Sequence, residues 1–105
     1  MNTIPKGFYY NFKHNPEQDI YNFAYYITGY EGGYTEDAEV PMVVYFRLYK
    51  TPKIWVRPAA MVFDDVSERV ENIKKQPTRF FKVKDIETIQ KLKEKFDEMY
   101  PDLLP

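Results

Sequence analysis

The chain has 105 residues, of which 44% are hydrophobic and 30% are charged, and it contains no cysteine. This length is typical of one domain with a single core, and the composition excludes a disordered polar chain. The net charge of -1 excludes a protein that attracts duplex nucleic acid through its overall charge. Aromatic side chains account for 18% of the residues, an excess that suggests either a ring-filled core or a binding surface.

The first part of the chain alternates in the way that strands do. Aromatic residues occupy every second position of residues 7–13, and a polar loop follows at residues 14–19. Residues 20–29 alternate again and predict a long second strand that ends at Gly29. A glycine pair and four acids within residues 30–40 predict an exposed turn. In the second strand, one face would carry Tyr21, Phe23, Tyr25 and Ile27.

The middle of the chain predicts two more strands. Residues 41–49 are β-branched and aromatic on both faces, as expected of a central strand with its proline at the beginning. Residues 50–53 predict a turn, and residues 54–56 resume the extended structure. Pro58 interrupts that strand and opens a single helical turn over residues 58–63, since proline is tolerated at the first helical position.

The next segment, residues 64–76, stays ambiguous because its apolar spacing is helical but it lacks clear caps. Residues 78–83 predict a closing strand. In residues 64–76, the apolar residues with helical spacing are Val66, Val70 and Ile73.

Residues 85–100 predict an amphipathic helix with Asp85 as its N-cap and Pro101 just beyond its end. Its apolar stripe approximates a heptad seam, so the helix would pack on its own sheet or form a homo-oligomer through residues 86–100. The stripe consists of Ile86, Ile89, Leu92, Phe96, Met99 and Tyr100.

Together these elements predict a single domain over residues 1–105, with a β-rich part at residues 7–83 and the helix at residues 85–100. The fold class is mostly β (α+β): a small curved sheet or SH3-like barrel of roughly four or five strands with one C-terminal amphipathic helix. The chain lacks cysteine, a membrane-length apolar segment and an apolar leader at residues 1–5. We therefore expect a cytoplasmic protein with no disulfide and no membrane contact.

Several runs in the chain carry a family resemblance. The run Trp55-Val56-Arg57-Pro58 is followed by Met61 and preceded by Val43-Val44-Tyr45 and Leu48-Tyr49. Further agreements are Gly7-x-Tyr9, Phe12-Lys13, Gly29, Thr35-Glu36, Val66 and Arg79-Phe80. With these residues, the sequence resembles a family of small bacterial and phage proteins known as domain of unknown function 1653, over about residues 7–83. The resemblance implies a compact β-rich domain and supplies no mechanism.

The sequence also departs from the pattern of that family. The family usually has a histidine before the Thr-Glu pair and a threonine after it, where this chain has Tyr34 and Asp37. The phenylalanine that usually follows the methionine is Val62 here. An activity that depended on the missing histidine would be absent from this chain.

The chain has too few histidine, cysteine and serine residues to form a typical metal site or a nucleophilic catalytic site. His14 is the only histidine and Ser67 the only serine, and neither stands in a ligand or nucleophile motif. We therefore expect no metal and no cofactor, and a protein that is not an enzyme. The acidic pairs Glu36-Asp37 and Asp64-Asp65 leave a small acid–base enzyme as a third alternative.

The aromatic and arginine residues of the central strands indicate a binding surface. Tyr45 and Trp55 come from neighbouring predicted strands, and a period of two puts an arginine on the same face of each strand. Rings stack on planar ligands, and guanidinium groups bind phosphate or carboxylate through paired hydrogen bonds. The alternative is that the rings fill the core while Arg57 pairs with Glu36 or Asp64. The predicted ligand-binding residues are a rim of Tyr34, Thr35 and Glu36 and a floor of Tyr45, Arg47, Tyr49, Trp55 and Arg57.

The sequence thus favours a small binding module that holds a small anionic or nucleotide-like ligand, as a sequestering protein of a bacterium or phage would. The alternative is an SH3-like module in which the same aromatic face receives a protein partner. A binding site of either kind requires that Trp55 and Arg57 border an open hollow instead of being enclosed in the core.

Overall fold

The computed structural model describes residues 4–28, 33–72 and 74–103. Three positions used in the predictions lie outside the described residues. They are Gly29 at the predicted end of the second strand, Gly32 of the glycine pair, and Ile73 of the helical spacing.

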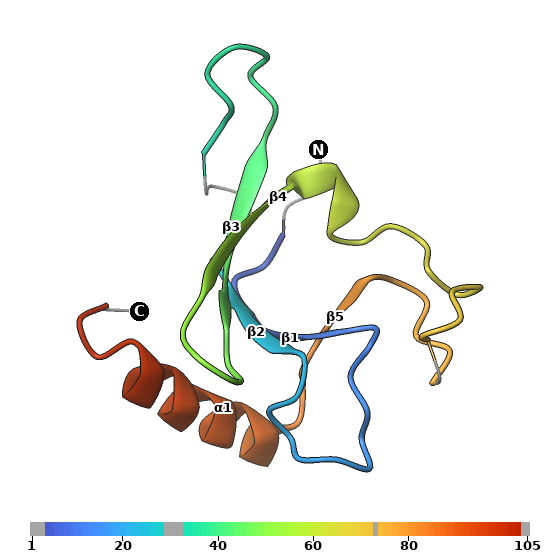
Figure 1. The fold of residues 1–105 in the computed structure, drawn as a ribbon, viewed down its shortest axis with the longest axis vertical. Coiled ribbons are helices and arrows are strands. Elements are labelled where there is room, and N and C mark those ends of the chain that lie inside the picture. The colour runs from blue at the N-terminus through green and yellow to red at the C-terminus, as the bar shows by residue number, and fades with distance from the viewer. Residues whose placement is uncertain (1–3, 29–32, 73, 104–105) are drawn as a thin grey trace.

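Five strands form one antiparallel sheet with the order β4-β3-β2-β1-β5 (Figure 1). They are β1 (Gly7–Asn11), β2 (Ala24–Ile27), β3 (Met42–Arg47), β4 (Ile54–Pro58) and β5 (Phe80–Lys82). A short 3-10 helix, η2 (Ala59–Met61), follows β4, and helix α1 (Ile86–Met99) follows β5. The mostly β fold with one C-terminal helix is confirmed, and of the two expected forms the sheet is the open one, with β4 and β5 at its edges.

The second strand is shorter than its alternation predicts. The carboxylate of Asp19 accepts hydrogen bonds from the backbone N–H groups of Tyr21 and Asn22, at 2.7 and 3.0 Å, and so closes a turn there. Phe23 then has a φ of 53°, a left-handed conformation that no strand continues. The strand therefore begins only at Ala24, and Tyr21 packs on the opposite side of the sheet from Tyr25.

The described part of residues 64–76 contains turns and no helix. The side chain of Asn72 is buried and takes over the role of a capping group. Its amide donates to the carbonyls of Val66 and Gln76, at 3.0 and 2.6 Å, and accepts from the N–H of Gln76 at 2.8 Å. Val70 is 93% exposed while Val66 is buried, so the helical interpretation of this segment is wrong.

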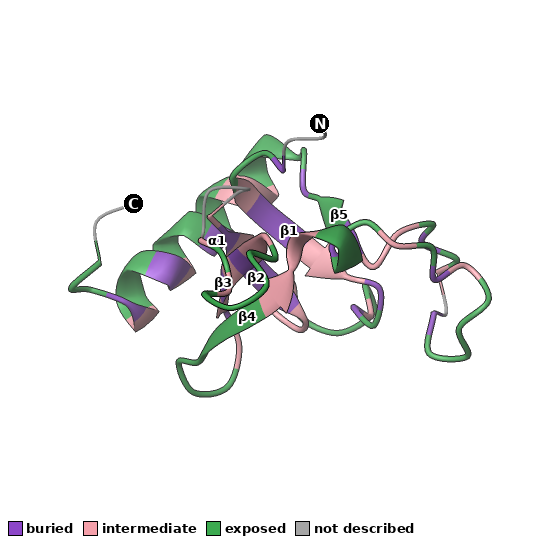
Figure 2. Ribbon diagram, turned by 90° about the horizontal axis from the view of Figure 1, so that it is seen from above, coloured by how far each residue is buried: buried purple, intermediate pink, exposed green. Residues whose placement is uncertain are grey.

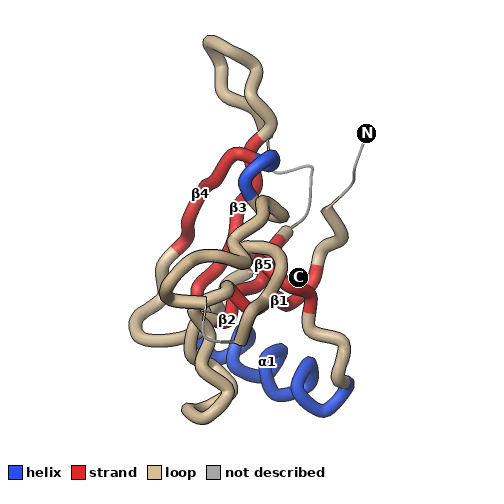
Figure 3. Tube along the Cα trace, turned by 90° about the vertical axis from the view of Figure 1, so that its right-hand side faces the viewer, coloured by secondary structure: helices blue, strands red, loops and turns tan. Residues whose placement is uncertain are grey.

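Helix α1 covers one face of the sheet (Figures 1 and 3). Asp85 is its N-cap, as predicted, and accepts a hydrogen bond from the backbone N–H of Thr88. Leu92, Phe96 and Tyr100 are buried against the sheet, so the apolar stripe is used within the same chain. Ile86 is 81% exposed and does not belong to that contact, contrary to the prediction. No helix in the described ranges is long and apolar enough to cross a membrane.

The strands alternate between two apolar layers. One layer lies between the sheet and α1 and includes Phe8, Ala24 and Leu48. The other lies on the opposite face, where Tyr9, Ile27 and Val62 are buried. Chain segments after β4 cover only part of this second face, and the burial pattern in Figure 2 shows the outer strand β4 largely exposed.

Candidate functional site

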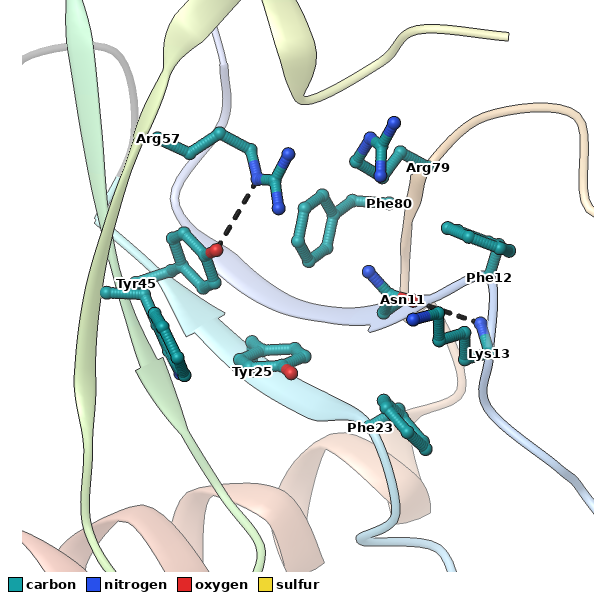
Figure 4. Close-up of a pocket in the computed structure, with 10 residues that line it drawn as sticks. Asn11, Phe12, Lys13, Phe23, Tyr25, Tyr45, Arg57, Arg79 and Phe80 are labelled. Atoms are coloured by element: carbon teal, nitrogen blue, oxygen red, sulfur yellow. Dashed lines mark hydrogen bonds between the residues drawn. The ribbon is translucent and has the colours of Figure 1, made fainter. Parts of the chain in front are cut away.

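A hollow of about 190 Å³ opens on the sheet face opposite α1. Figure 4 shows side chains from several strands converging on it. We call it the sheet pocket. Its lining residues are Asn11, Phe12, Lys13, Phe23, Tyr25, Tyr45, Trp55, Arg57, Arg79 and Phe80.

Strand register explains why these side chains share one face. Residues that stand directly opposite each other in an antiparallel pair point to the same side of the sheet. Tyr45 is paired with Trp55 across β3 and β4, and Asn11 is paired with Phe80 across β1 and β5. The pocket therefore draws its lining from both edges of the sheet as well as from its centre.

Tyrosine and phenylalanine rings form the floor of the sheet pocket. The ring of Tyr25 meets the rings of Tyr45, Tyr49 and Phe80 edge to face, with centroids 5.2, 5.6 and 5.7 Å apart. The hydroxyls of Tyr25 and Tyr49 share a hydrogen bond of 2.5 Å. Burial, together with this bond, raises the pKa of Tyr25 well above its usual value. The floor therefore carries no charge at neutral pH.

Arg57 lies at the rim and forms no ion pair with a described carboxylate, although Asp64 is close enough for the charge of Arg57 to contribute to lowering its pKa. Its Nε donates a long hydrogen bond of 3.4 Å to the hydroxyl of Tyr45, and its guanidinium lies 5.9 Å from the ring centre of Phe80. No carboxylate of residues 4–28, 33–72 or 74–103 lies within 4.0 Å of it. The alternative in which Arg57 pairs with Glu36 or Asp64 is therefore wrong for the described chain.

Arg79 is the true partner of Asp64. Its Nε and Nη2 each donate to a carboxylate oxygen of Asp64, both at 2.8 Å, in the two-pronged geometry that guanidinium groups favour. The bonds from Arg79 lower the pKa of Asp64. The backbone N–H of Arg79 also donates to the carbonyl of Asp64, at 3.0 Å, so the pair fastens the chain after η2 to β5.

Trp55 borders the sheet pocket on the exposed edge strand. It is 39% exposed, and the ammonium of Lys53 lies 4.8 Å from the centre of its ring. Trp55 and Arg57 are thus not enclosed in the core, and the condition for a binding site is met.

The structure divides the predicted binding residues into three groups. Tyr45, Trp55 and Arg57 line the sheet pocket, and Tyr49 supports its floor through Tyr25. Arg47 turns away, since its guanidinium donates to the carbonyl and hydroxyl of Thr51 at 2.7–3.1 Å. The residues of the predicted rim lie in a hairpin that projects away from the sheet and are not part of the lining; they are Tyr34, Thr35 and Glu36.

The lining residues that the sequence did not indicate come mainly from β1, β5 and the turns beside them. The signal for Tyr25 was present, because the alternation of the second strand puts it on a ring-bearing face. Nothing local in the sequence shows that Arg79 and Phe80 stand beside Asn11, since that pairing joins strands from opposite ends of the β-rich part. The missed residues are Asn11, Phe12, Lys13, Phe23, Tyr25, Arg79 and Phe80.

The side chain of His14 packs inside the protein and does not line the sheet pocket. It is buried, its ring stacks on Tyr10 at 3.6 Å, and its Nδ1 donates to the carbonyl of Asn22 at 2.6 Å. Within the described part of the chain, no group of three or more histidine, cysteine or acidic residues is arranged to hold a metal ion.

One family model matches the chain, that described as "Protein of unknown function (DUF1653)", over residues 7–82. This range is well over half of the sequence. The chain belongs to this family. No curated protein and no solved structure matches the chain.

All ten lining residues of the sheet pocket fall within the part that matches DUF1653. Helix α1 lies beyond the matched residues, although it covers the opposite sheet face. The pocket is therefore built entirely by the DUF1653 portion of this chain, and α1 supports that portion from behind.

Proposed function

We propose that this protein is a non-enzymatic binding module that holds a small anionic or nucleotide-like ligand in the sheet pocket. The single observation that carries the proposal is the combination, in one open hollow, of an aromatic floor with a guanidinium that forms no ion pair with a described carboxylate.

The charges around the pocket favour an anion. Lys13, Arg57 and Arg79 line it, and none of the lining residues is acidic. Asp64 balances Arg79 from outside the lining. Because Arg57 and Arg79 are partly buried beside rings, their attraction for an anion is stronger than it would be on a fully solvated surface.

The rings favour a ligand with a flat face. The half-exposed ring of Trp55 offers a stacking surface, and base–aromatic stacking is worth about 1–3 kcal/mol per base. A hollow of about 190 Å³ is smaller than the roughly 300–1,000 Å³ typical of sites for drug-sized ligands. The ligand would thus be small, with part of it outside the pocket.

The environment of Asp64 supports binding over acid–base catalysis. A general base works best with a pKa near the working pH, whereas the hydrogen bonds from Arg79 lower the pKa of Asp64. Glu36, the other acid considered, lies in the projecting hairpin and not in the lining.

The setting we propose is the cytoplasm of a bacterium or of a cell infected by a phage. The lack of cysteine suits a reducing compartment. In that setting, a module without catalytic groups would sequester its ligand and release it unchanged.

A protein partner is the second candidate, favoured by the edge strand β4. Its side chains Ile54 and Val56 are both more than half exposed, and an edge strand offers free backbone groups to an added strand.

The test combines ligand detection with a matched pair of variants. Mass spectrometry of the purified, denatured protein identifies any ligand carried through purification, and thermal shift measurements use nucleoside mono-, di- and triphosphates. Arg57→Ala should abolish the shift and leave the unliganded melting temperature unchanged. Arg47→Ala removes the same charge from the same sheet face outside the pocket and should keep the shift.

Equal effects of the two variants, or no shift with any ring-bearing anion, would refute ligand binding in this pocket. A protein that copurifies and is lost on Ile54→Lys would support the second candidate instead.

A further inference from the structure

We propose that the ligand of the sheet pocket is a free nucleoside monophosphate, with its phosphate held by Arg57 and Lys13, and that Arg79 is a positioning residue. This inference rests on the proposed function and specifies the chemistry of the same site. It follows from a difference between the two arginines at the rim.

Arg79 is already committed to a partner. Two of its guanidinium nitrogens donate to Asp64, and the side chains of Arg79 and Asp64 are only 14% and 32% exposed. Its guanidinium also lies 5.7 Å from the ring centre of Phe12. The pair is therefore electrically neutral as a unit, and its role is to hold the wall of the pocket in place.

Arg57 has the opposite character. Only its Nε is engaged, in the long bond to the hydroxyl of Tyr45, and this bond orients the group. Figure 4 shows its two terminal nitrogens directed toward the pocket, with Phe80 between Arg57 and Arg79. Two terminal N–H groups side by side match two oxygens of one phosphate. Arg57 is the arginine of the pocket that is free to bind a ligand.

The positive charges that line the pocket fit one phosphomonoester. Arg57 and Lys13 contribute two positive charges, and Arg79 with Asp64 contributes none in sum. A phosphomonoester carries a charge of about -1.5 to -2 at pH 7. A phosphodiester leaves one of these cations unbalanced, and a diphosphate or triphosphate brings more negative charge than the lining residues neutralise.

The aromatic end of the pocket fits the planar part of the same ligand. In Figure 4, Phe23 and Tyr25 lie at the end of the pocket away from Arg57 and Arg79, and Lys13 lies beside Asn11 between the two ends. An anionic group at one end and a flat ring at the other describe a nucleotide lying along the pocket. The net charge of -1 disfavours a polyanionic strand.

Isothermal titration calorimetry at fixed, low ionic strength tests the inference. The probes are the four common ribonucleoside 5′-monophosphates, their nucleosides, their 5′-diphosphates, and the dinucleoside monophosphate ApA, whose only phosphate is a diester. At least one monophosphate should bind tenfold or more tightly than its nucleoside, and more tightly than its diphosphate and ApA. A nucleoside or ApA that binds as tightly as every monophosphate would overturn the inference.

Variants separate the two arginines. Arg57→Ala should reduce the affinity for the monophosphate at least tenfold, to the level of its nucleoside, without changing the affinity for the nucleoside. Arg57→Lys retains the charge but loses the paired donors, so it should bind the monophosphate several-fold more weakly than the wild type. An unchanged ratio of monophosphate to nucleoside affinity in Arg57→Ala would overturn the inference.

Asp64→Asn tests the positioning role of Arg79, because it frees one positive charge without removing the arginine. The variant should shift the preference from the monophosphate toward the diphosphate, a change that a loss of structure alone does not produce. An Asp64→Asn protein that is folded by circular dichroism and keeps the wild-type preference would overturn the assignment of roles.

The outcomes also separate this inference from the proposed function. Binding of diphosphates or aromatic carboxylates in preference to monophosphates, still lost on Arg57→Ala, would refute the inference and support the proposed function. Failure of every ring-bearing anion to bind would refute both.

Discussion

The hydroxyl of Tyr100 provides a sharp test of how α1 is fixed to the sheet. It donates to the carbonyl of Arg47 at 2.7 Å and accepts from the backbone N–H of Lys53 at 3.1 Å. These two groups flank the turn between β3 and β4, so one atom joins the end of the helix to that turn. Tyr100→Phe removes the atom and keeps the ring.

The expected cost follows from the bonds that are lost. A neutral hydrogen bond contributes about 0.5–1.5 kcal/mol net to stability, and Tyr100 makes two. The ring is buried, so water does not readily replace the hydroxyl. We therefore expect Tyr100→Phe to lower the free energy of unfolding by about 1–3 kcal/mol, which corresponds to at least about 4 °C in melting temperature for a domain of this size.

Urea unfolding followed by circular dichroism measures this loss, with Tyr26→Phe as the matched control. The ring of Tyr26 packs on the same face, 4.9 Å from that of Phe96. Its hydroxyl bonds to no residue in the described part of the chain, so this variant should change stability by less than about 0.5 kcal/mol. If the two variants differ by no more than that amount, the hydroxyl of Tyr100 does not anchor the helix.

Two further predictions concern the core layer between the sheet and α1 and the polar loop after β1. Leu92→Ala should cost about 2–5 kcal/mol of unfolding free energy in urea, because Leu92 is fully buried under α1, while Lys91→Ala on the exposed side should cost under about 0.5 kcal/mol; equal costs would contradict the packing. Burial lowers the pKa of His14 below its ordinary value of 6.5, so the unfolded chain binds the proton more readily. Stability should then fall as the pH decreases through 6.5 toward the lowered pKa, and urea midpoints from pH 8 to 5 should show a smaller fall in His14→Gln; identical pH profiles would contradict this assignment.

Much of the fold was predictable where one local pattern continues without interruption. Residues 41–49 predict a central strand and form β3 over Met42–Arg47, and Asp85 caps the helix as its position suggests. A single helical turn does follow β4, but Pro58 is the last residue of the strand and the N-cap of η2, so the turn is shorter than the predicted residues 58–63. In these segments, the backbone preference and the burial pattern agree.

The failures have a physical origin in side chains that compete with the backbone. The alternation of residues 20–29 predicts a long strand, but Asp19 captures two N–H groups and Phe23 adopts a positive φ. In the segment after β4, the buried amide of Asn72 satisfies the groups that a helix would otherwise pair internally. The spacing of apolar residues gives no information about which side chains hydrogen-bond to the backbone in place of a helix or strand.

The site was predictable only where it is local. Tyr45, Trp55 and Arg57 belong to one hairpin, so a period of two suffices to place them together. The partner of Asp64 depends on the path of the chain from η2 back to the sheet, where the N–H of Phe80 donates to the carbonyl of Val62 at 3.1 Å. That path brings Arg79 to Asp64, whereas the sequence pattern suggests only Arg57 as a partner for Asp64.

The division of the sheet into two layers makes adjacent residues serve different purposes. Tyr25 lies in the floor of the pocket, while its neighbour Tyr26 packs against the helix. A slip of β2 by a single residue would exchange them and would turn every ring of that strand to the wrong side. The pocket therefore forms only when β2 pairs in the correct register. A ligand that binds in the pocket would bind only to chains whose sheet has that register.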